Sequence, residues 1–350
     1  MTLTTDFERV ELPLSTPFAI ARGTTSTAEN VLVRVEAEDG TAGLGNAAPS
    51  AYYGETADTV AAVLPDLLAV VEDVDDPFAR ERVERRLRDV VGRNPAARAA
   101  VSVALADLVG KRLGAPLYRV WGLDPDAAPP TSYSVGIDDP DRMRTKASEA
   151  VDAGYDVLKV KLGGGDGRDR ERLAAVREGA PEARMRVDGN GAWTPAEAVE
   201  MSEALAAHGV EFVEQPVPAD DVAGLRFVRE RGAVPVAADE AVETAADVPR
   251  VADAVDVVVA KVMKCGGLRE TRRVAHVARA HGCEAMLGCM VESNASIAAA
   301  WHLAPLFDYA DLDGSLLLAE DPVSGVPVDG STADLAALDR PGTGAVERDE

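Results

Sequence analysis

The heptapeptide VLKVKLG at residues 157–163 indicates how the second half of the chain folds. It is a short run of aliphatic and β-branched residues that ends at a glycine, as buried strands commonly do. Similar runs recur between residues 131 and 312, separated by segments with helical periodicity such as 195–208 and 269–281. The expected strands are 132–137, 157–162, 185–188, 211–214, 234–238, 255–262, 284–287 and 307–312. Eight alternating strand–helix units predict a (β/α)₈ (TIM-like) barrel over residues 126–325.

The first part of the chain has a different organisation. Alternating runs such as 31–35 are interrupted at Asp39-Gly40, which predicts an antiparallel hairpin or meander. Residues 55–113 then show helical periodicity. Strands followed by helices predict an α+β capping domain over residues 1–125, and the Gly-, Pro- and Asp-rich tail at 326–350 is expected to complete it. The predicted fold class is therefore α/β, a C-terminal barrel with an N-terminal cap.

The charge of the chain limits its partners. Sixty acidic residues against 36 basic ones give a net charge of −24, which argues against nucleic acid or an anionic membrane as partner. No apolar run is long enough for a membrane span, and the first residues lack the pattern of a signal peptide. The three cysteines lack metal-ligand spacing. These features predict a cytoplasmic enzyme acting on a small molecule, and the acidity suggests adaptation to a salty (halophilic) cytoplasm.

Five charged residues recur at nearly constant spacing in the barrel half. Lys161, Asp188, Glu214, Asp239 and Lys264 are separated by 27, 26, 25 and 25 residues, and each is expected at the C-terminal end of a strand, just before a turn. An isolated Asp at a strand end is more often a helix N-cap, but five such residues in barrel register predict an active site at the C-terminal mouth.

The residue types at these positions indicate a proton-transfer reaction. Three adjacent carboxylates, Asp188, Glu214 and Asp239, need a cation, and hard oxygen ligands favour Mg²⁺. Only six lysines occur among 36 basic residues, yet four lie between positions 159 and 264. A lysine can become a base near neutral pH, whereas an arginine cannot. We therefore expect Lys161 and Lys264 to act as bases on opposite faces of a Mg²⁺-stabilised enolate, with Lys159 lowering the pKa of Lys161.

These motifs resemble the enolase superfamily, within its muconate-cycloisomerase-like subgroup. The resemblance implies that Asp188, Glu214 and Asp239 ligate Mg²⁺ and that Lys161 and Lys264 form the acid–base pair. Asn190 and Glu240 are expected to support these ligands. The segments that carry the resemblance are Lys159-Val160-Lys161, Asp188-Gly189-Asn190, Glu214-Gln215-Pro216, Ala238-Asp239-Glu240 and Lys264-Cys265-Gly266-Gly267.

Within this subgroup the chain is most similar to dipeptide epimerases. Asp311 and Asp313 resemble the paired aspartates that hold the α-ammonium group of a dipeptide in those enzymes. The segment 288–293, which contains Cys289 and Met290, is also similar to theirs. The resemblance therefore implies epimerisation of an L-Ala-D/L-Xaa dipeptide. A homo-oligomer is expected, as for many barrels.

One departure from the family concerns the side chain of the second residue. Ala-Glu epimerases carry an arginine in the cap loop for the substrate glutamate, but the aligned position here is Gly23, with Arg22 one residue earlier. Arg22 and Tyr52 are still expected to contact the substrate, and the sequence suggests an apolar or small second side chain.

Three alternatives remain at the level of sequence. An o-succinylbenzoate synthase or a muconate-type cycloisomerase would use the same metal ligands, but neither would need Asp311 and Asp313 to bind an ammonium group. A catalytically silent paralogue typically loses a lysine or a metal ligand, and this chain keeps all five.

Overall fold

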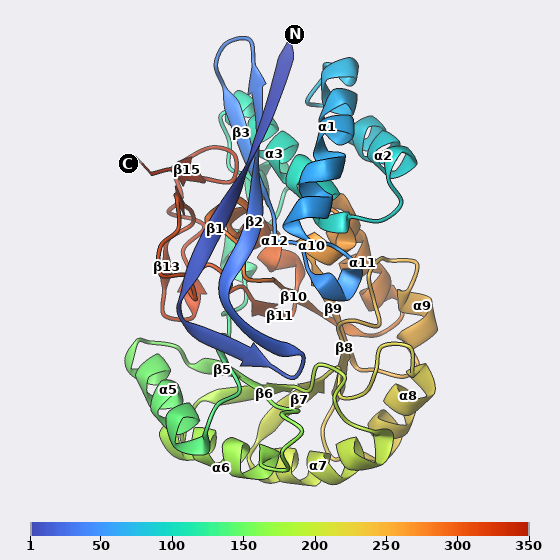
Figure 1. The fold of residues 1–350 in the computed structure, drawn as a ribbon, viewed down its shortest axis with the longest axis vertical. Coiled ribbons are helices and arrows are strands. Elements are labelled where there is room, and N and C mark those ends of the chain that lie inside the picture. The colour runs from blue at the N-terminus through green and yellow to red at the C-terminus, as the bar shows by residue number, and fades with distance from the viewer. Residues whose placement is uncertain (1, 349–350) are drawn as a thin grey trace.

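The structure is a computed structural model that describes residues 2–348, and it consists of a cap above a barrel (Figure 1). The cap begins with a three-stranded antiparallel sheet, β1 (Leu3–Ile20), β2 (Gly23–Ala37) and β3 (Ala42–Ala47). Helices α1 (Ala57–Val74), α2 (Arg80–Val90) and α3 (Pro95–Leu113) follow. The expected strand block and helix block of the cap are thus both present.

Close approach between β3 and α3 holds the cap together. The alanine-rich middle of α3 is buried, and Gly43 on β3 faces it. A Cβ atom at Gly43 would lie 2.0 Å from the backbone oxygen of Ala104, so glycine is required there. The β1–β2 hairpin is longer than β3, and its tip extends over the mouth of the barrel (Figure 1), where Ile137 N–H donates to Ala19 O at 2.8 Å.

The eight predicted barrel strands are confirmed. They form one parallel sheet in sequence order, and a bridge between Thr131 and Ala310 joins its two ends. Ser132 N–H donates to Ala310 O at 3.2 Å across this closure. The strands are β4 (Tyr133–Val135), β5 (Val157–Lys161), β6 (Arg184–Asp188), β7 (Val210–Glu214), β8 (Val236–Ala238), β9 (Val257–Lys261), β10 (Glu284–Gly288) and β11 (Tyr309–Asp311).

Helices cover the outside of the barrel, as the alternating pattern predicts. Local sequence fixes their ends: α7, for example, begins with a capping box between Thr194 and Glu197. The helices are α5 (Pro140–Asp152), α6 (Asp169–Gly179), α7 (Pro195–Ala207), α8 (Val222–Arg231), α9 (Val248–Val251), α10 (Val262–Cys265), α11 (Leu268–Ala280) and α12 (Asn294–Leu303). Helix α10 is a single extra turn between β9 and α11.

The chain returns to the cap after the last barrel strand. Short strands β12 (Val323–Ser324), β13 (Val328–Asp329), β14 (Thr332–Ala333) and β15 (Val346–Glu347) lie in this tail. Thr343 donates from N–H (2.7 Å) and from Oγ1 (2.8 Å) to the buried carboxylate of Asp107 on α3. The tail therefore packs against the capping helices. No helix within residues 2–348 has the length and apolar character to cross a membrane.

Side chains inside the barrel form two layers beneath the cap. Residues two apart on a strand face the same side, so each rim residue has a partner one layer deeper. In the deeper layer Lys159 pairs with Arg186 and Val259 pairs with Met286. Arg186 is buried against the rings of Phe212 and Tyr309, 5.5 and 4.9 Å from their centroids, and these two rings also contact each other. This filled layer forms the floor of the mouth above it.

Candidate active site

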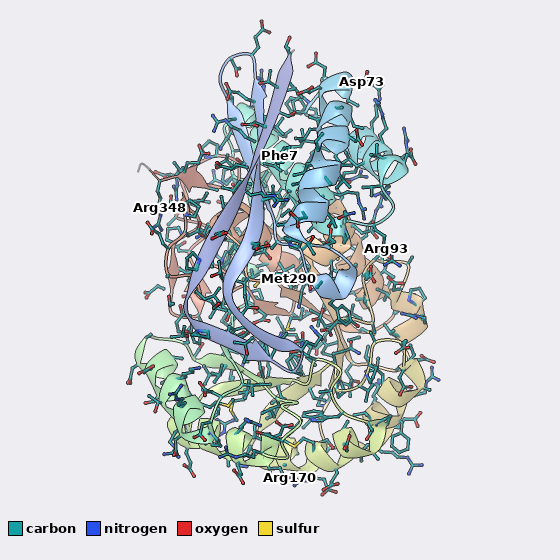
Figure 2. The ribbon with its side chains drawn as sticks, in the orientation of Figure 1. Phe7, Asp73, Arg93, Arg170, Met290 and Arg348 are labelled. Atoms are coloured by element: carbon teal, nitrogen blue, oxygen red, sulfur yellow. The ribbon has the colours of Figure 1, made fainter. Side chains whose placement is uncertain are left out.

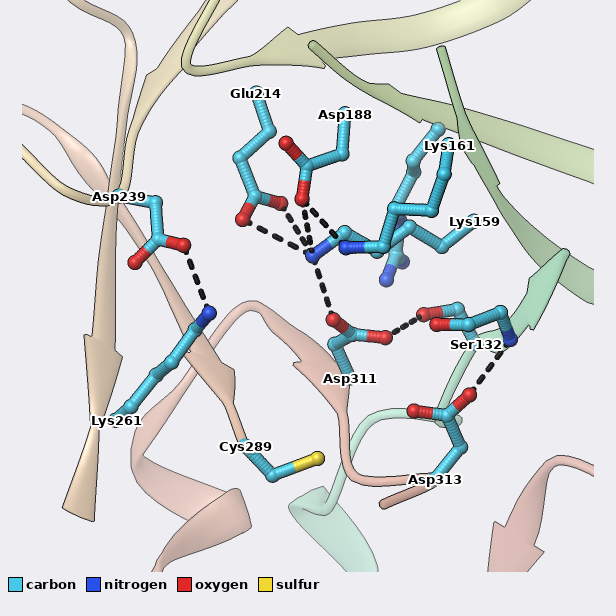
Figure 3. A network of polar contacts seen from close by, with 12 residues as sticks. Ser132, Lys159, Lys161, Asp188, Glu214, Asp239, Lys261, Cys289, Asp311 and Asp313 are labelled. Carbon is cyan, nitrogen blue, oxygen red and sulfur yellow. Dashed lines mark hydrogen bonds and ion pairs between the residues drawn. The ribbon is translucent and has the colours of Figure 1, made fainter. Parts of the chain in front are cut away.

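Three carboxylates lie side by side at the mouth of the barrel (Figure 3). Asp188 and Glu214 end β6 and β7 and are paired in register, and Asp239 directly follows β8. All three are buried, and one oxygen of each lies within 4.8 Å of the others. Hard oxygen donors at this separation fit a divalent cation such as Mg²⁺. The spacing in the sequence therefore correctly predicted that these residues meet.

Burial and the charges around these carboxylates shift their pKa values in opposite directions. Burial, together with the charges of Asp188 and Asp239, raises the pKa of Glu214 to about 8, although Lys159 opposes this shift. Burial acts in the same direction on Asp239, but the ammonium groups of Lys261 and Lys264 outweigh it and keep its pKa well below the usual range. The site is therefore a cluster of buried charges that depend on one another.

Lys159 and Lys161 reach this cluster from β5. The Nζ of Lys161 donates to Asp188 Oδ2 at 2.7 Å. The Nζ of Lys159 lies 2.8 Å from Glu214 Oε2, 3.3 Å from Asp188 Oδ2 and 2.7 Å from Asp311 Oδ2. Burial disfavours the charge of Lys159, but these carboxylates outweigh burial and raise its pKa well above the usual range. Lys159 is thus a fixed cation that joins the carboxylate triad to Asp311.

The second lysine pair differs from expectation. The sequence placed Lys264 at a strand end, and this placement is wrong, because β9 ends at Lys261 and Lys264 lies in helix α10. The Lys264 side chain is fully buried, and its Nζ donates to the backbone oxygen and Oδ1 of Asp239, both at 2.6 Å. The Nζ of Lys261 donates to Asp239 Oδ2 at 2.7 Å, and its side chain is 9% exposed.

Lys261 is the site residue that sequence reasoning missed. It occupies the rim layer, because it pairs with Gly288, which in turn pairs with Asp311. A Cβ atom at Gly288 would lie 3.0 Å from Lys261 Cε, so this glycine leaves room for the lysine. Lys161 and Lys261 approach the carboxylates from opposite sides (Figure 3). One signal was available: Lys261 lies inside the expected strand 255–262, whereas Lys264 lies beyond it and only continues the regular interval of 25 residues.

Asp311 and Asp313 lie at the end of β11, across the mouth from Asp239 (Figure 3). Asp311 Oδ1 accepts a hydrogen bond from Ser132 Oγ at 2.6 Å, and Asp313 Oδ2 accepts one from Ser134 N–H at 2.6 Å. Both carboxyls are buried, and burial together with Asp311 raises the pKa of Asp313 to about 6. These two acids are therefore buried at the barrel mouth and do not belong to the outer surface.

Cys289 and Met290 border the same side of the mouth, directly after β10. Both are partly buried, and Cys289 Sγ accepts a hydrogen bond from Gly314 N–H at 3.3 Å. Met290 N–H donates to the buried carboxylate of Glu292 at 2.9 Å. The loop that carries both residues is thus held at its backbone.

Arg22 at the hairpin tip contacts the barrel loops next to the triad. Its Nη2 lies 2.7 Å from Glu240 Oε1, its Nη1 donates to Asn190 O at 3.0 Å, and its guanidinium lies 4.6 Å from the centre of the Tyr52 ring. Asn190 N–H donates to Asp188 Oδ1 at 2.8 Å, and Asn190 Nδ2 donates to Glu240 Oε1 at 3.3 Å. Arg22, Tyr52, Asn190 and Glu240 therefore form one connected group beside the metal-ligand candidates. In Figure 2, Met290 is labelled near the middle of the view, between the capping helices and the barrel helices.

Comparison with known proteins agrees with this geometry. The chain is 36% identical over 338 residues to an L-Ala-D/L-Glu epimerase of Bacteroides thetaiotaomicron, covering 96% of this chain and 86% of the relative. It is also 36% identical to a hydrophobic dipeptide epimerase of Enterococcus faecalis, covering 90% of this chain and 91% of the relative. A crystal structure of the dipeptide epimerase from Enterococcus faecalis V583, complexed with Mg and L-Leu-L-Tyr, superimposes with a TM-score of 0.91 at 33% identity, with 99% of each chain covered.

Family models account for most of the chain. Residues 3–122 match the N-terminal domain of the mandelate racemase/muconate lactonizing enzyme family, and residues 142–350 match the enolase C-terminal domain-like family. Together with the barrel, the cap and the buried carboxylate triad, these matches show that the chain belongs to the mandelate racemase/muconate lactonizing enzyme family of the enolase superfamily.

Proposed function

We propose that this protein is a Mg²⁺-dependent dipeptide epimerase that inverts the α-carbon of the substrate's C-terminal residue. The observation that carries the proposal is the placement of Lys161 and Lys261 on opposite sides of the buried triad, with further carboxylates across the mouth (Figure 3). The Mg²⁺- and dipeptide-bound relative supports the same reading.

The triad is the proposed metal site. Asp188, Glu214 and Asp239 would hold Mg²⁺, which supplies positive charge next to the substrate carboxylate and so makes the α-proton easier to remove. Lys159 and Lys264 are sealed from solvent and hold these carboxylates in place. Their proposed role is therefore to position ligands and balance charge, and we assign the second base to Lys261 in place of Lys264.

Proton transfer follows from the two remaining lysines. One of Lys161 and Lys261 removes the α-proton from one face of the substrate, and the other returns a proton to the opposite face, which inverts the carbon. Both side chains are 9% exposed, so each can reach a bound substrate while staying in a largely water-free site. In this scheme each lysine is the base for one diastereomer and the acid for the other.

Asp311 and Asp313 are proposed to bind the α-ammonium group of the dipeptide. Two buried carboxyls facing the cavity can form charge-assisted hydrogen bonds with a cation. The substrates of an o-succinylbenzoate synthase or a muconate-type cycloisomerase carry no ammonium group, so a pair of acids at this place would have no substrate cation to bind there. Their burial therefore favours the epimerase among the three candidate reactions.

Proton NMR in D₂O tests the function directly. A library of L-Ala-L-Xaa dipeptides is incubated with enzyme and Mg²⁺, and we expect deuterium to replace the α-proton of the second residue as the L,D-product accumulates. Chelation of Mg²⁺ with EDTA should stop both processes. Absence of exchange across the library, with dehydration of the cyclohexadiene precursor of o-succinylbenzoate instead, would overturn the proposal.

We also propose that the enzyme works in a salt-rich cytoplasm. Outside the four site lysines, only Lys111 and Lys146 remain, and these pair with Asp107 and Asp138 at 2.8 and 3.1 Å. The three cysteines are free thiols, which suits a reducing compartment. The net charge of −24 is the main support, because salt screens its self-repulsion.

A further inference from the structure

A pocket of about 390 Å³ opens beside the carboxylate triad, beneath the tip of the β1–β2 hairpin. Its floor is formed by the residues that follow the three metal-ligand candidates on their strands, namely Asn190, Gln215 and Glu240. Arg22 and Tyr52 close it from the cap. The pocket therefore touches both the barrel mouth and the cap, and its contents would lie next to a substrate held at the triad.

The position of this pocket relative to the proposed substrate points to its occupant. If the ammonium group of the dipeptide lies at Asp311 and Asp313, the peptide enters from the β11 side of the mouth. The α-carbon of the second residue then lies between Lys161 and Lys261, with its carboxylate at the triad. The side chain of that residue is thereby directed to the far side of the triad, where the pocket is.

The charges of the pocket are arranged so that its cation is already neutralised. Arg22 is the one basic residue of the lining, and its guanidinium is shared among Glu240, Asn190 O and the Tyr52 ring. The Glu240 side chain is 2% exposed and so cannot turn to solvent to release the arginine. Asp220 also lines the pocket, but it is exposed, so solvent screens its charge. An arriving carboxylate would therefore meet no free positive charge.

Apart from the amides of Asn190 and Gln215, the rest of the lining is apolar. Ala21, Ala192, Pro218 and Ala219 contribute methyl and ring carbons, and Tyr52 contributes its ring. Burial of aliphatic surface against such a lining is favourable, whereas burial of an unpaired carboxylate is costly. Sequence identity does not decide this question, since two relatives that are each 36% identical are named for glutamate and for hydrophobic substrates.

Building on the proposed function, we infer that this pocket receives the side chain of the second residue and that the Arg22–Glu240 ion pair makes it reject carboxylate side chains in favour of uncharged ones. Glu240 acts in this scheme as a specificity-determining residue, because it already binds the Arg22 guanidinium with which a glutamate side chain of the substrate would have to pair.

The experiment compares two substrates that differ in charge and hardly in shape, L-Ala-L-Glu and L-Ala-L-Gln. We expect the wild-type enzyme to have a kcat/KM for the glutamine dipeptide at least about tenfold above that for the glutamate dipeptide. In Glu240→Gln the arginine is released, and the ratio should fall by about tenfold or more. Because both substrates are measured on one protein, any general loss of metal affinity or folding cancels in the ratio.

Asp220→Asn is the matched control. It removes one negative charge from the same pocket but leaves the Arg22–Glu240 pair intact, so the ratio should change by less than about twofold, as for an exposed charge. A wild-type preference for L-Ala-L-Glu, or an unchanged ratio in Glu240→Gln, would overturn the inference while leaving the epimerase assignment in place. Absence of α-proton exchange with every dipeptide would instead overturn the proposed function and this inference with it.

Discussion

A pair of lysines contacts the carboxylate triad from each of two sides, and the two pairs differ in local structure. On one side Lys159 and Lys161 stand two residues apart on β5, so both side chains face the barrel interior. On the other side Lys261 ends β9 and Lys264 follows in helix α10, three residues later. In each pair one lysine is sealed and the other is 9% exposed. Similar side-chain arrangements thus need not come from equal sequence spacing.

The two sealed lysines differ in what they hold. Lys159 contacts three carboxylates, two in the triad and one at Asp311, and so couples the metal-ligand candidates to the proposed ammonium site. Lys264 contacts Asp239 alone, which Lys261 also neutralises. The β5 side therefore bears more of the electrostatic organisation of the site than the β9 side does.

The largest expected effect separates the two lysines that retain some accessibility, Lys161 and Lys261, from each other. We expect Lys161→Ala and Lys261→Ala each to lower epimerisation by about 10³-fold or more, because each removes an acid–base group. Each variant should still exchange the α-proton of one diastereomer in D₂O, and the two variants should retain opposite diastereomers. NMR of L,L- and L,D-dipeptides measures both.

Lys264→Ala is the control for this assignment. As a positioning residue it should slow exchange of both diastereomers by similar factors. Loss of exchange for a single diastereomer in Lys264→Ala, together with two-sided exchange in Lys261→Ala, would restore Lys264 as the base and break the comparison between the two sides.

The sealed lysines give the next largest effect. Lys159→Met leaves the buried Glu214 without a cationic partner and removes a cation from Asp311, so it should lower the free energy of unfolding by about 3–5 kcal/mol. Lys264→Met should cost less, because Lys261 still pairs with Asp239. Urea unfolding of the two metal-free variants provides the test. Equal decreases in the free energy of unfolding would contradict the greater electrostatic importance of the β5 side.

The loop after β10 contains a buried carboxyl group, Glu292, whose protonation should make the stability of the protein depend on pH. Burial raises the pKa of Glu292 from 4.5 to about 7, against the opposing effects of Ser296, Met290 N–H and Lys261. The folded protein therefore binds this proton more tightly than the unfolded chain, so the contribution to stability is full below about pH 4.5 and is lost as the pH rises through about 7. The loss is roughly 3 kcal/mol.

Glu292→Gln should remove this part of the pH dependence of stability. Denaturant unfolding between pH 4.5 and 8 measures it, and Glu320→Gln, at an exposed position, should keep the wild-type profile. If the free energy of unfolding of Glu292→Gln changed with pH as steeply as that of the wild type, Glu292 would not be the source of this pH dependence.

The smallest expected effect is that of salt, which should act on the charges of the surface and hardly on those of the buried site. Transfer from concentrated KCl to dilute buffer should lower the melting temperature by roughly several degrees, because the net charge of −24 is then less screened. The internal charges of the lysine–carboxylate cluster are shielded from salt and should keep their pairing. Thermal melts at a series of KCl concentrations test this, and a melting temperature independent of salt would contradict the proposed salt adaptation.

Much of the molecule follows from the sequence by itself. The alternation of apolar runs and amphipathic helices determines a barrel, and parallel strands then bring residues spaced by about 25 positions to one rim. Asp188, Glu214 and Asp239 could therefore be predicted to meet, and Lys161 beside them. Periodicity is sufficient here because each residue ends its strand or directly follows it.

Only the tertiary structure decided which residues complete the site. Lys261, not Lys264, shares the rim layer, since β9 ends one residue before helix α10 begins and strand register fixes the layer. The pairing of Arg22 with Glu240 joins positions 218 residues apart, and Ser132 and Asp311 meet only where the barrel closes. Sequence patterns record local conformation, whereas these contacts depend on how the cap and the two ends of the barrel are brought together.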